Sequence, residues 1–331
     1  MIYFTHINFK DKLKSLIKPS FSAMVIIGLL YSCITYKNVD FQAMRPAQIK
    51  LGTNFERVDI HCEFCSDPQS VYRMDTLDQS YTIVSLYFLQ SLKENLEKSP
   101  VFQETKFDLV SSDSLLSMLK DFKTRHQENG LVILLDSIFI NDTLITHKER
   151  YQSPFYLYGI IHKIGCRTYY KKTMQILDNH LLEDTLFWPP QPTIWMLDAN
   201  IPTAEEARIE TGIKAGEAYA HYLAPYWTEQ SRYFYYGNRY FNQAYNFIQK
   251  SELDSAVNVL QQQQKEKLSR NKAMMNFHNL AIVYELKDDM IKAFTMADSS
   301  YKIKKTELTK SYIEKLRIRK LDKAALDWQM N

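Results

Sequence analysis

Glycine is scarce in this chain, and the scarcity argues against most nucleotide-binding proteins. There are 8 glycines among 331 residues, whereas phosphate-binding loops need several of them close together so that the backbone can approach the phosphates. The sequence contains no Gly-x-x-x-x-Gly-Lys-[Ser/Thr], no Gly-x-Gly-x-x-Gly, no Gly-x-Ser-x-Gly and no His-Glu-x-x-His. We therefore predict no catalytic residues, no cofactor and no metal site.

The N-terminal hydrophobic run is too short to span a membrane. A spanning helix needs about 20 apolar residues, whereas Ala23–Leu30 is soon followed by polar residues. Four lysines precede the run within residues 10–18. A basic segment followed by a short apolar segment is the arrangement of a signal peptide.

This signal-like segment ends in Leu30-Tyr31-Ser32-Cys33, which resembles a bacterial lipobox. The resemblance implies that residues 1–32 are a lipoprotein signal peptide, that the chain is cut before Cys33, and that Cys33 carries acyl chains. Several acyl chains together anchor a protein stably, so membrane lipid is one predicted partner. An ordinary secretory signal with an incidental cysteine, or an uncleaved short anchor, are the alternatives.

Little net charge remains once the signal is removed. The whole chain carries a formal charge of +3, and residues 1–32, with four lysines and one aspartate, account for +3 of it. A nucleic-acid-binding domain presents a basic face, so we predict no nucleic-acid partner. The roughly 300 residues after the signal suffice for about two domains.

Cysteine is also scarce, with 4 residues. Cys62 and Cys65 form a Cys-x-x-Cys pair, and Cys166 stands alone. In an oxidising envelope Cys62 and Cys65 are candidates for a disulfide. A redox motif is a weaker alternative because its first cysteine favours a helix N-terminus, whereas Cys62 ends a predicted strand. A zinc site is another, although one such pair supplies only half of the ligands.

Proline and glycine are absent from the end of the chain, where we therefore expect long helices. The last proline is Pro225 and the last glycine is Gly237. The predicted fold is an α+β (or α/β) N-terminal domain followed by an all-α, tetratricopeptide-like helical C-terminal domain. The predicted segments are the signal peptide over 1–32, a membrane-proximal linker over 33–50, a mixed helix–sheet domain over 51–228 and a helical repeat-like domain over 229–331.

Within the mixed domain, the apolar run Leu131–Leu135 predicts a strand that is buried on both faces. Gly165 is expected to form a hairpin turn between two strands. A helix is expected to begin at Thr203 and Glu206, which have the spacing of a capping box. The other expected elements are strands at about 56–64, 101–110, 155–163 and 167–177, turns or loops at 141–142 and 188–192, and helices at about 77–99 and 112–122.

The helix that begins at Thr203 carries small residues four positions apart, at Gly212, Gly216 and Ala220. Positions four apart share a helix face. We therefore expect this face to lie close against the sheet.

The C-terminal helices contain spacings typical of tetratricopeptide repeats. Leu280, Ala281 and Tyr284 fall on one predicted helix, and Ala293 and Ala297 fall on the next. A weaker unit precedes this one. Because two units match imperfectly and about three are normally needed, a generic helical bundle is the alternative.

Six short motifs follow one another along the chain. They are the lipobox, Met44–Ala47, Ala215–Ala220, Pro225–Trp227, Asn279–Glu285 and Trp328-Gln329. This order resembles Bacteroidetes-type lipoproteins of unknown function with tetratricopeptide-like C-terminal helices. The resemblance covers nearly the whole mature chain, and it implies no known activity and no catalytic residue.

An aromatic cluster is the main candidate for a binding surface. Residues 233–245 contain seven aromatic side chains. If the segment is helical, two of its faces are aromatic; one packs on the core, and the other seats against the N-terminal domain or forms a groove for a peptide or glycan. The candidate binding residues are Tyr233, Tyr236 and Tyr240.

These features favour a non-enzymatic protein-interaction scaffold or adaptor, because repeat-like helices present concave binding surfaces. The predicted partners are membrane lipid, through acylated Cys33, and a protein. The location is the cell envelope, on the outer membrane facing the periplasm, because Ile34–Asn38 lacks the acidic cluster that resembles a surface-export tag. The alternative is an envelope enzyme or a glycan- or peptide-binding protein that uses the aromatic cluster or the Cys62/Cys65 pair.

Overall fold

The computed structural model describes residues 35–52, 54–62, 76–111, 129–147, 155–188 and 202–330. The predicted lipidation site Cys33, Cys65 and the helix expected at 112–122 lie outside these ranges. The described chain divides into two compact units. The first, which we call the helical unit, comprises residues 35–42 and 229–320, and the second, the sheet unit, comprises the described residues of 43–228 and 321–330.

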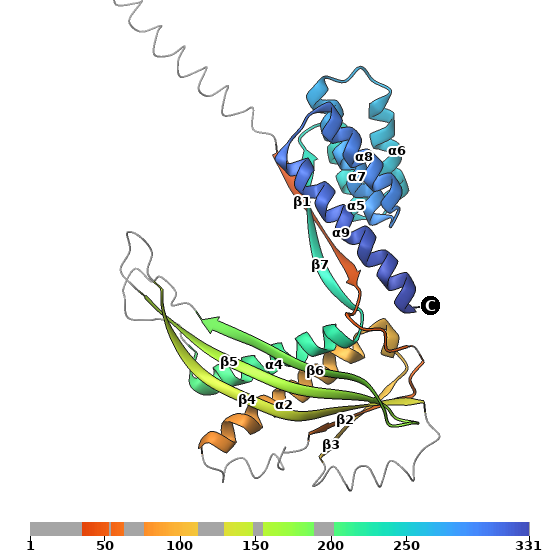
Figure 1. Ribbon diagram of the computed structural model, residues 1–331. Helices are drawn as coiled ribbons and strands as arrows, with labels where there is room; N and C mark the ends of the chain where they lie inside the picture. The colour runs from red at the N-terminus through yellow and green to blue at the C-terminus, as the bar shows by residue number, and fades with distance from the viewer. Residues whose placement is uncertain are drawn as a thin grey trace, which may run out of the picture. The chain divides into compact units, whose positions relative to one another are not determined.

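The predicted fold class is confirmed, because a mixed helix–sheet region is followed along the chain by a run of helices (Figure 1). The sheet unit is built on a five-stranded sheet of order β3-β2-β4-β5-β6. Strand β2 is parallel to β3 and β4, while β4, β5 and β6 are antiparallel. The strands are β2 (Arg57–Cys62), β3 (Lys106–Ser111), β4 (Gly130–His147), β5 (Phe155–Tyr170) and β6 (Gln175–Trp188).

The predicted strand at 131–135 is confirmed as part of β4, and all five of its side chains are buried. Leu131, Ile133 and Leu135 belong to one apolar core, whereas Val132 and Leu134 pack on the other face of the sheet. This two-sided burial is what a continuous apolar run predicts.

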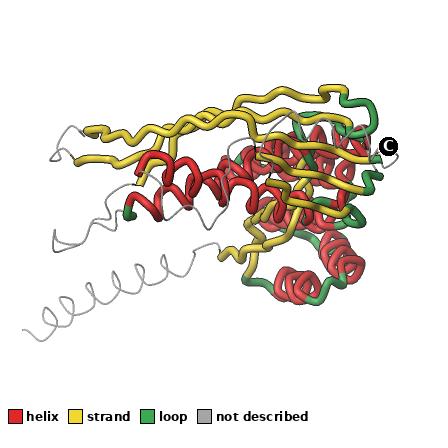
Figure 2. The backbone as a smooth tube through the Cα atoms, turned by 90° about the horizontal axis from the view of Figure 1, so that it is seen from below, coloured by secondary structure: helices red, strands yellow, loops and turns green. Residues whose placement is uncertain are grey.

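Helices α2 (Thr76–Glu97) and α4 (Ala204–Leu223) pack against the sheet and against each other (Figure 2). The predicted capping box at the start of α4 is confirmed. The expectation that the small residues of α4 face the sheet is wrong. A Cβ atom on Gly212 would lie 2.6 Å from the Val84 carbonyl oxygen, and one on Gly216 would lie 2.4 Å from that of Phe88. The glycines therefore allow close contact with helix α2.

Gly165 does not form the predicted hairpin turn. It lies within β5, opposite an irregularity in β4, where a Cβ atom would meet the Ser137 hydroxyl at 2.2 Å. The glycine is needed there for the close approach of two strands. The turn between β5 and β6 falls instead at residues 171–174, where Met174 adopts a φ of 55°. Asn141 and Asp142, expected to turn the chain, continue β4.

Two strands were not predicted, and both contribute to the helical unit. Residues expected to form a linker form β1 (Thr35–Arg45), and the start of the aromatic segment, expected to be helical, lies in β7 (Tyr226–Tyr236). These strands pair as a two-stranded sheet, which we call the ribbon. Burial near the end of β7 alternates from Arg232 to Tyr233 to Phe234, the period of a strand. Gly237, with a φ of 104°, then separates β7 from the next helix.

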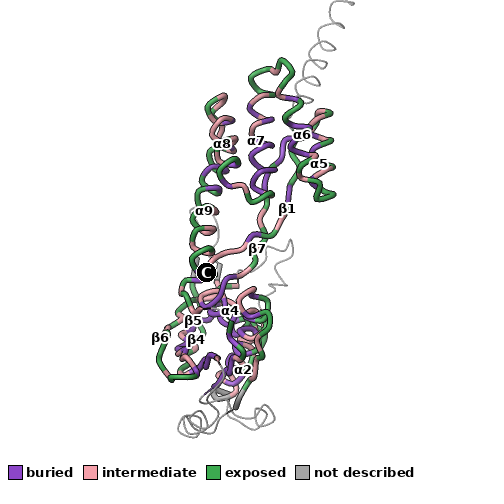
Figure 3. The backbone as a smooth tube through the Cα atoms, turned by 90° about the vertical axis from the view of Figure 1, so that its right-hand side faces the viewer, coloured by how far each residue is buried: buried purple, intermediate pink, exposed green. Residues whose placement is uncertain are grey.

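Helices α5 to α8 of this unit pair in succession, and α7 is buried around most of its circumference (Figure 3). Its Leu280 and Ala281 side chains lie in the same core as Ala293 and Ala297 of α8. Alanine on one helix therefore leaves room for larger side chains on its neighbour. The helices are α5 (Arg239–Gln249), α6 (Leu253–Gln264), α7 (Arg270–Leu286), α8 (Met290–Ile303) and α9 (Glu307–Met330).

Candidate functional site

Two exposed tyrosines lie side by side on the ribbon of the helical unit. Tyr233 of β7 is 54% exposed and Tyr36 of β1 is 45% exposed. Their ring centroids are 6.1 Å apart, with the rings edge to face. Tyr36 also contacts the buried ring of Tyr235 at 5.1 Å. We call Tyr36 and Tyr233 the tyrosine pair.

Side chains of α7 fix the strand that carries this pair. The Asn279 amide accepts a hydrogen bond from the Tyr235 N–H at 2.8 Å and donates one to the Tyr235 carbonyl at 2.9 Å. His278 Nε2 lies 3.1 Å from the Tyr233 carbonyl oxygen, and its Nδ1 lies 3.3 Å from the Thr309 hydroxyl. Burial lowers the pKa of His278 to about 4, so its ring is neutral and donates from Nε2 while Nδ1 accepts.

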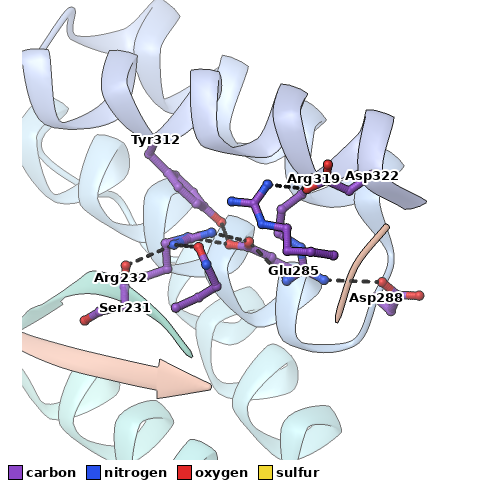
Figure 4. A network of polar contacts seen from close by, with 9 residues as sticks. Ser231, Arg232, Glu285, Asp288, Tyr312, Arg319 and Asp322 are labelled. Atoms are coloured by element: carbon purple, nitrogen blue, oxygen red, sulfur yellow. Dashed lines mark hydrogen bonds and ion pairs between the residues drawn. The ribbon is translucent and has the colours of Figure 1, made fainter. Parts of the chain in front are cut away.

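A buried ionic network holds the same strand on α7 and α9 (Figure 4). Arg232 donates two hydrogen bonds to the Glu285 carboxylate, one of 3.0 Å from Nε and one of 2.8 Å from Nη2. Both side chains are almost fully buried. The Tyr312 hydroxyl donates to Glu285 Oε2 at 2.9 Å. Burial and then the nearby Glu285 carboxylate raise the pKa of Tyr312, so it remains a donor.

A second arginine and an aromatic ring complete the network. Arg319 of α9 lies 3.4 Å from Glu285 and 3.8 Å from Asp288, so two arginines face two carboxylates. The Phe41 ring of β1 lies within cation–π distance of both arginines, 5.3 Å from Arg232 and 5.4 Å from Arg319. Both strands of the ribbon are thereby tied to the helices, and the tyrosine pair stands on a rigid support.

The three tyrosines singled out from the sequence do not form one surface. Tyr233 and Tyr236 are an odd number of positions apart on β7, so their side chains leave opposite faces of the ribbon. Tyr236 packs with Tyr245 of α5, and the Lys37 ammonium lies 5.1 Å from its ring centroid. Tyr240 lies on α5, and its hydroxyl bonds to Glu266, which raises the Tyr240 pKa. Only Tyr233 remains in the candidate surface.

Sequence reasoning missed Tyr36, because its partner on β7 is nearly 200 positions away. The supporting residues Asn279 and His278 did leave a signal, since together with Asn276 they interrupt an otherwise apolar stretch of α7. Buried polar side chains need hydrogen-bond partners. Polar residues on a buried part of α7 therefore indicate that another segment of the chain lies within hydrogen-bond distance of them.

The cysteines offer no reactive thiol among the described residues. Cys62 is disulfide-bonded, and its pairing with Cys65 remains a prediction because Cys65 lies outside the described part of the chain. Cys166 is free and buried in the core of the sheet unit. Burial raises the pKa of Cys166, and a protonated thiol is a poor nucleophile.

The buried Asp59 carboxylate joins β2 to the turn that follows β5 and also pairs within its own strand. Asp59 of β2 pairs with Lys171 at 2.8 Å and with Arg57 at 2.8 Å. Burial lowers the pKa of the neighbouring His61 to about 4, which keeps this ring neutral. Within the described ranges, no group of three or more His, Cys, Asp or Glu side chains could hold a metal ion. The helices described here also include none that is both long and apolar enough to cross a membrane.

Two regions of the chain match known domain families. Residues 127–235 match a domain of unknown function, DUF8603, and residues 242–318 match another, DUF6340. The first match covers the β4–β7 region and the second covers most of the helices of the helical unit. No curated protein matches the chain.

Solved structures give distant similarities only. A minor lipoprotein from Acinetobacter baumannii is 5% identical, with a TM-score of 0.27 over 51% of this chain and 90% of that one. A neuraminyllactose-binding hemagglutinin homologue from Helicobacter pylori is 11% identical, with a TM-score of 0.29 over 52% and 86%. A PelC dodecamer from Paraburkholderia phytofirmans is 8% identical, with a TM-score of 0.22 over 55% and 96%. At these TM-scores the similarities carry no argument about fold or function.

Proposed function

We propose that this protein is a lipid-anchored envelope protein that binds an extended segment of a protein partner and acts as a non-enzymatic scaffold or adaptor. The observation that carries the proposal is the tyrosine pair. Tyrosine is enriched in protein interfaces because its ring buries apolar area while its hydroxyl still forms hydrogen bonds. Two neighbouring rings that are about half exposed suit such contacts.

The rigid support strengthens this interpretation. Ordering flexible side chains and loops on binding costs free energy. Here Asn279 and His278 already fix the backbone of Tyr233 and Tyr235, and the network around Glu285 fixes the strand beside them. The surface is thus preorganised, and binding can use most of the contact energy that the two rings supply.

Sequence features support the location. The lipobox-like segment that ends in Cys33 supports an acyl anchor, and the absence of an acidic cluster after it supports the periplasmic side of the outer membrane. The packing of two helices is consistent with the tetratricopeptide-like part of the proposed resemblance. The pairing of α7 with α8 places Leu280 and Ala281 in one core with Ala293, as that repeat would require.

Site-specific photocrosslinking in cells tests the binding role. A benzophenone amino acid at position 233 should yield a discrete adduct with a protein, and Tyr36→Ala should remove it. The matched control places the same amino acid at Ile291 of α8, which is 76% exposed on the same unit. Equal adducts at both positions, or none at 233, would refute the proposed surface. Retention of the chain on purified glycan without any protein adduct would favour the glycan-binding alternative.

The anchor is tested separately. Cys33→Ala should abolish acyl labelling and release the protein from membranes, whereas Cys166→Ala should change neither property. Persistence of acyl labelling in the Cys33→Ala variant would show that the predicted attachment site is wrong.

A further inference from the structure

Strand β6 forms one end of the five-stranded sheet, and among the described residues only β5 pairs with it. Natural proteins usually protect such an edge with lysine, proline, a bulge or a short strand. This strand has 14 residues and contains neither lysine nor proline, and its one irregularity against β5 lies at Leu177, near its start, so residues 178–188 form a regular edge. Several of its apolar side chains are exposed, namely Ile176, Leu177, Leu181 and Phe187. An edge with these properties is suited to pairing with another strand.

The sequence of β6 is complementary to itself in the antiparallel direction. If two copies align with Leu182 opposite Leu182, the regular segments 178–186 of the two copies face each other and the two leucines meet at the centre. Polar residues on either side are matched as well, because His180 of each copy faces Asp184 of the other. The pairs on the face that carries α4 are Asp178–Leu186, His180–Asp184 and Leu182–Leu182, and those on the other face are Asn179–Thr185 and Leu181–Glu183.

Neighbouring alignments are less favourable. Centring the pairing on Glu183 places this carboxylate opposite itself, and centring it on Leu181 places Asp178 opposite Asp184. Like charges directly opposite each other destabilise a pair of strands. In the alignment about Leu182, no two carboxylates are directly opposite. Glu183 is also paired within its own copy with Lys163, at 2.5 Å.

We propose that β6 is a self-association edge, at which a second copy of this chain adds its own β6 antiparallel and centred on Leu182. The twofold axis is normal to the sheet, so the α2 and α4 helices of both copies lie on the same side of one continuous sheet. Pairing over residues 178–186 adds about eight to ten backbone hydrogen bonds. This site is separate from the tyrosine pair, and its partner is the chain itself.

Cysteine crosslinking tests both the association and its register. Opposed Cβ atoms lie about 5 Å apart, so a tagged Leu181→Cys chain mixed with a Glu183→Cys chain should form a covalent dimer under mild oxidation. The matched control mixes Leu177→Cys with Glu183→Cys, which this register offsets by four residues, about 13 Å. The parent chain measures background from the native cysteines. Equal crosslinking of the control pair, or background levels in both mixtures, would overturn the proposal.

Charge at position 181 gives an independent test by sedimentation velocity of the full chain in detergent. In the proposed register residue 181 faces Glu183 of the other copy. Leu181→Glu should therefore weaken the dimer several-fold, whereas Leu181→Lys should retain it. A parent chain that stays monomeric at the highest soluble concentration, or equal effects of the two variants, would overturn the proposal. So would a different protein, in place of a second copy, as the adduct of a photocrosslinker at position 181 in cells.

Discussion

Replacing Glu285 by glutamine removes one charge from the buried network while changing the shape of the side chain little. Glu285 is 1% exposed and Arg232 is 4% exposed. The substitution leaves Arg232 without its bidentate carboxylate, because one of the two oxygens that accept from Arg232 and Tyr312 becomes an amide donor. Breaking a buried ion pair on one side costs about 3–5 kcal/mol. We expect the helical unit to lose free energy of unfolding in this range.

Urea unfolding measures the loss. With an m-value of about 2 kcal/mol/M, the expected change corresponds to a midpoint that is lower by about 1.5–2.5 M. Far-UV circular dichroism follows the helices, whereas Trp188, Trp227 and Trp328, the tryptophans among the described residues, report on the sheet unit. The dichroism transition should therefore shift more than the tryptophan transition.

Two control variants separate charge burial from packing. Glu314→Gln removes a carboxylate from an exposed pair with Arg317 and should cost less than about 0.5 kcal/mol. A double variant, Arg232→Met with Glu285→Met, removes both charges and should be more stable than Glu285→Gln, because apolar pairs can replace buried ion pairs. If Glu285→Gln costs no more than Glu314→Gln, or if the double variant is the least stable, the network does not hold the unit as described.

Three further results are expected from stability and reactivity measurements. Gly216→Val should lower the free energy of unfolding of the sheet unit by at least about 2 kcal/mol, because a Cβ atom would meet the Phe88 carbonyl oxygen at 2.4 Å. The control Ala218→Val, at an exposed position of the same helix, should lower it much less. Urea unfolding followed by tryptophan fluorescence measures both variants. The folded-state pKa of His278 is about 4 and its unfolded value is about 6.5, so the unfolded chain takes up the proton first and stability falls as the pH drops from about 6.5 towards 4. The free energy of unfolding should fall by about 2 kcal/mol between pH 7 and 5. Urea midpoints of His278→Gln should therefore depend less on pH than those of the parent. An equal dependence would contradict the assignment of this pH effect to His278. Cys166 should react with a thiol reagent only after unfolding, and rapid labelling of the folded protein at this position would show that it is not buried.

Local patterns in the sequence predicted the elements that depend on nearby residues. The apolar run Leu131–Leu135 could only be a buried strand or a short buried helix, and its length favoured the strand. Thr203 and Glu206 fix the start of α4 within a single turn, so the capping box was visible without tertiary information. The absence of proline and glycine after Gly237 likewise indicated the helices that follow.

The wrong predictions concern elements whose structure depends on contacts between distant parts of the chain. The segment Thr35–Arg45 resembled a linker because the partner that makes it a strand begins at Tyr226. The aromatic residues from Tyr233 onwards fit a helical spacing equally well, and only the pairing with β1 imposes a period of two. The three tyrosines chosen from the sequence therefore do not share one surface, and Tyr36 could not be included with Tyr233.

The pairing of β1 with β7 also has a consequence for the order in which the protein is made. The Thr35 hydroxyl donates to the carbonyl of Tyr236, across 201 positions of sequence. Synthesis proceeds from the N-terminus, so β1 emerges early and waits for most of the chain before its partner exists. Contacts of such long sequence separation form slowly. Strand β1 is thus made early but paired late, and the ribbon is complete only after β7 has been synthesised.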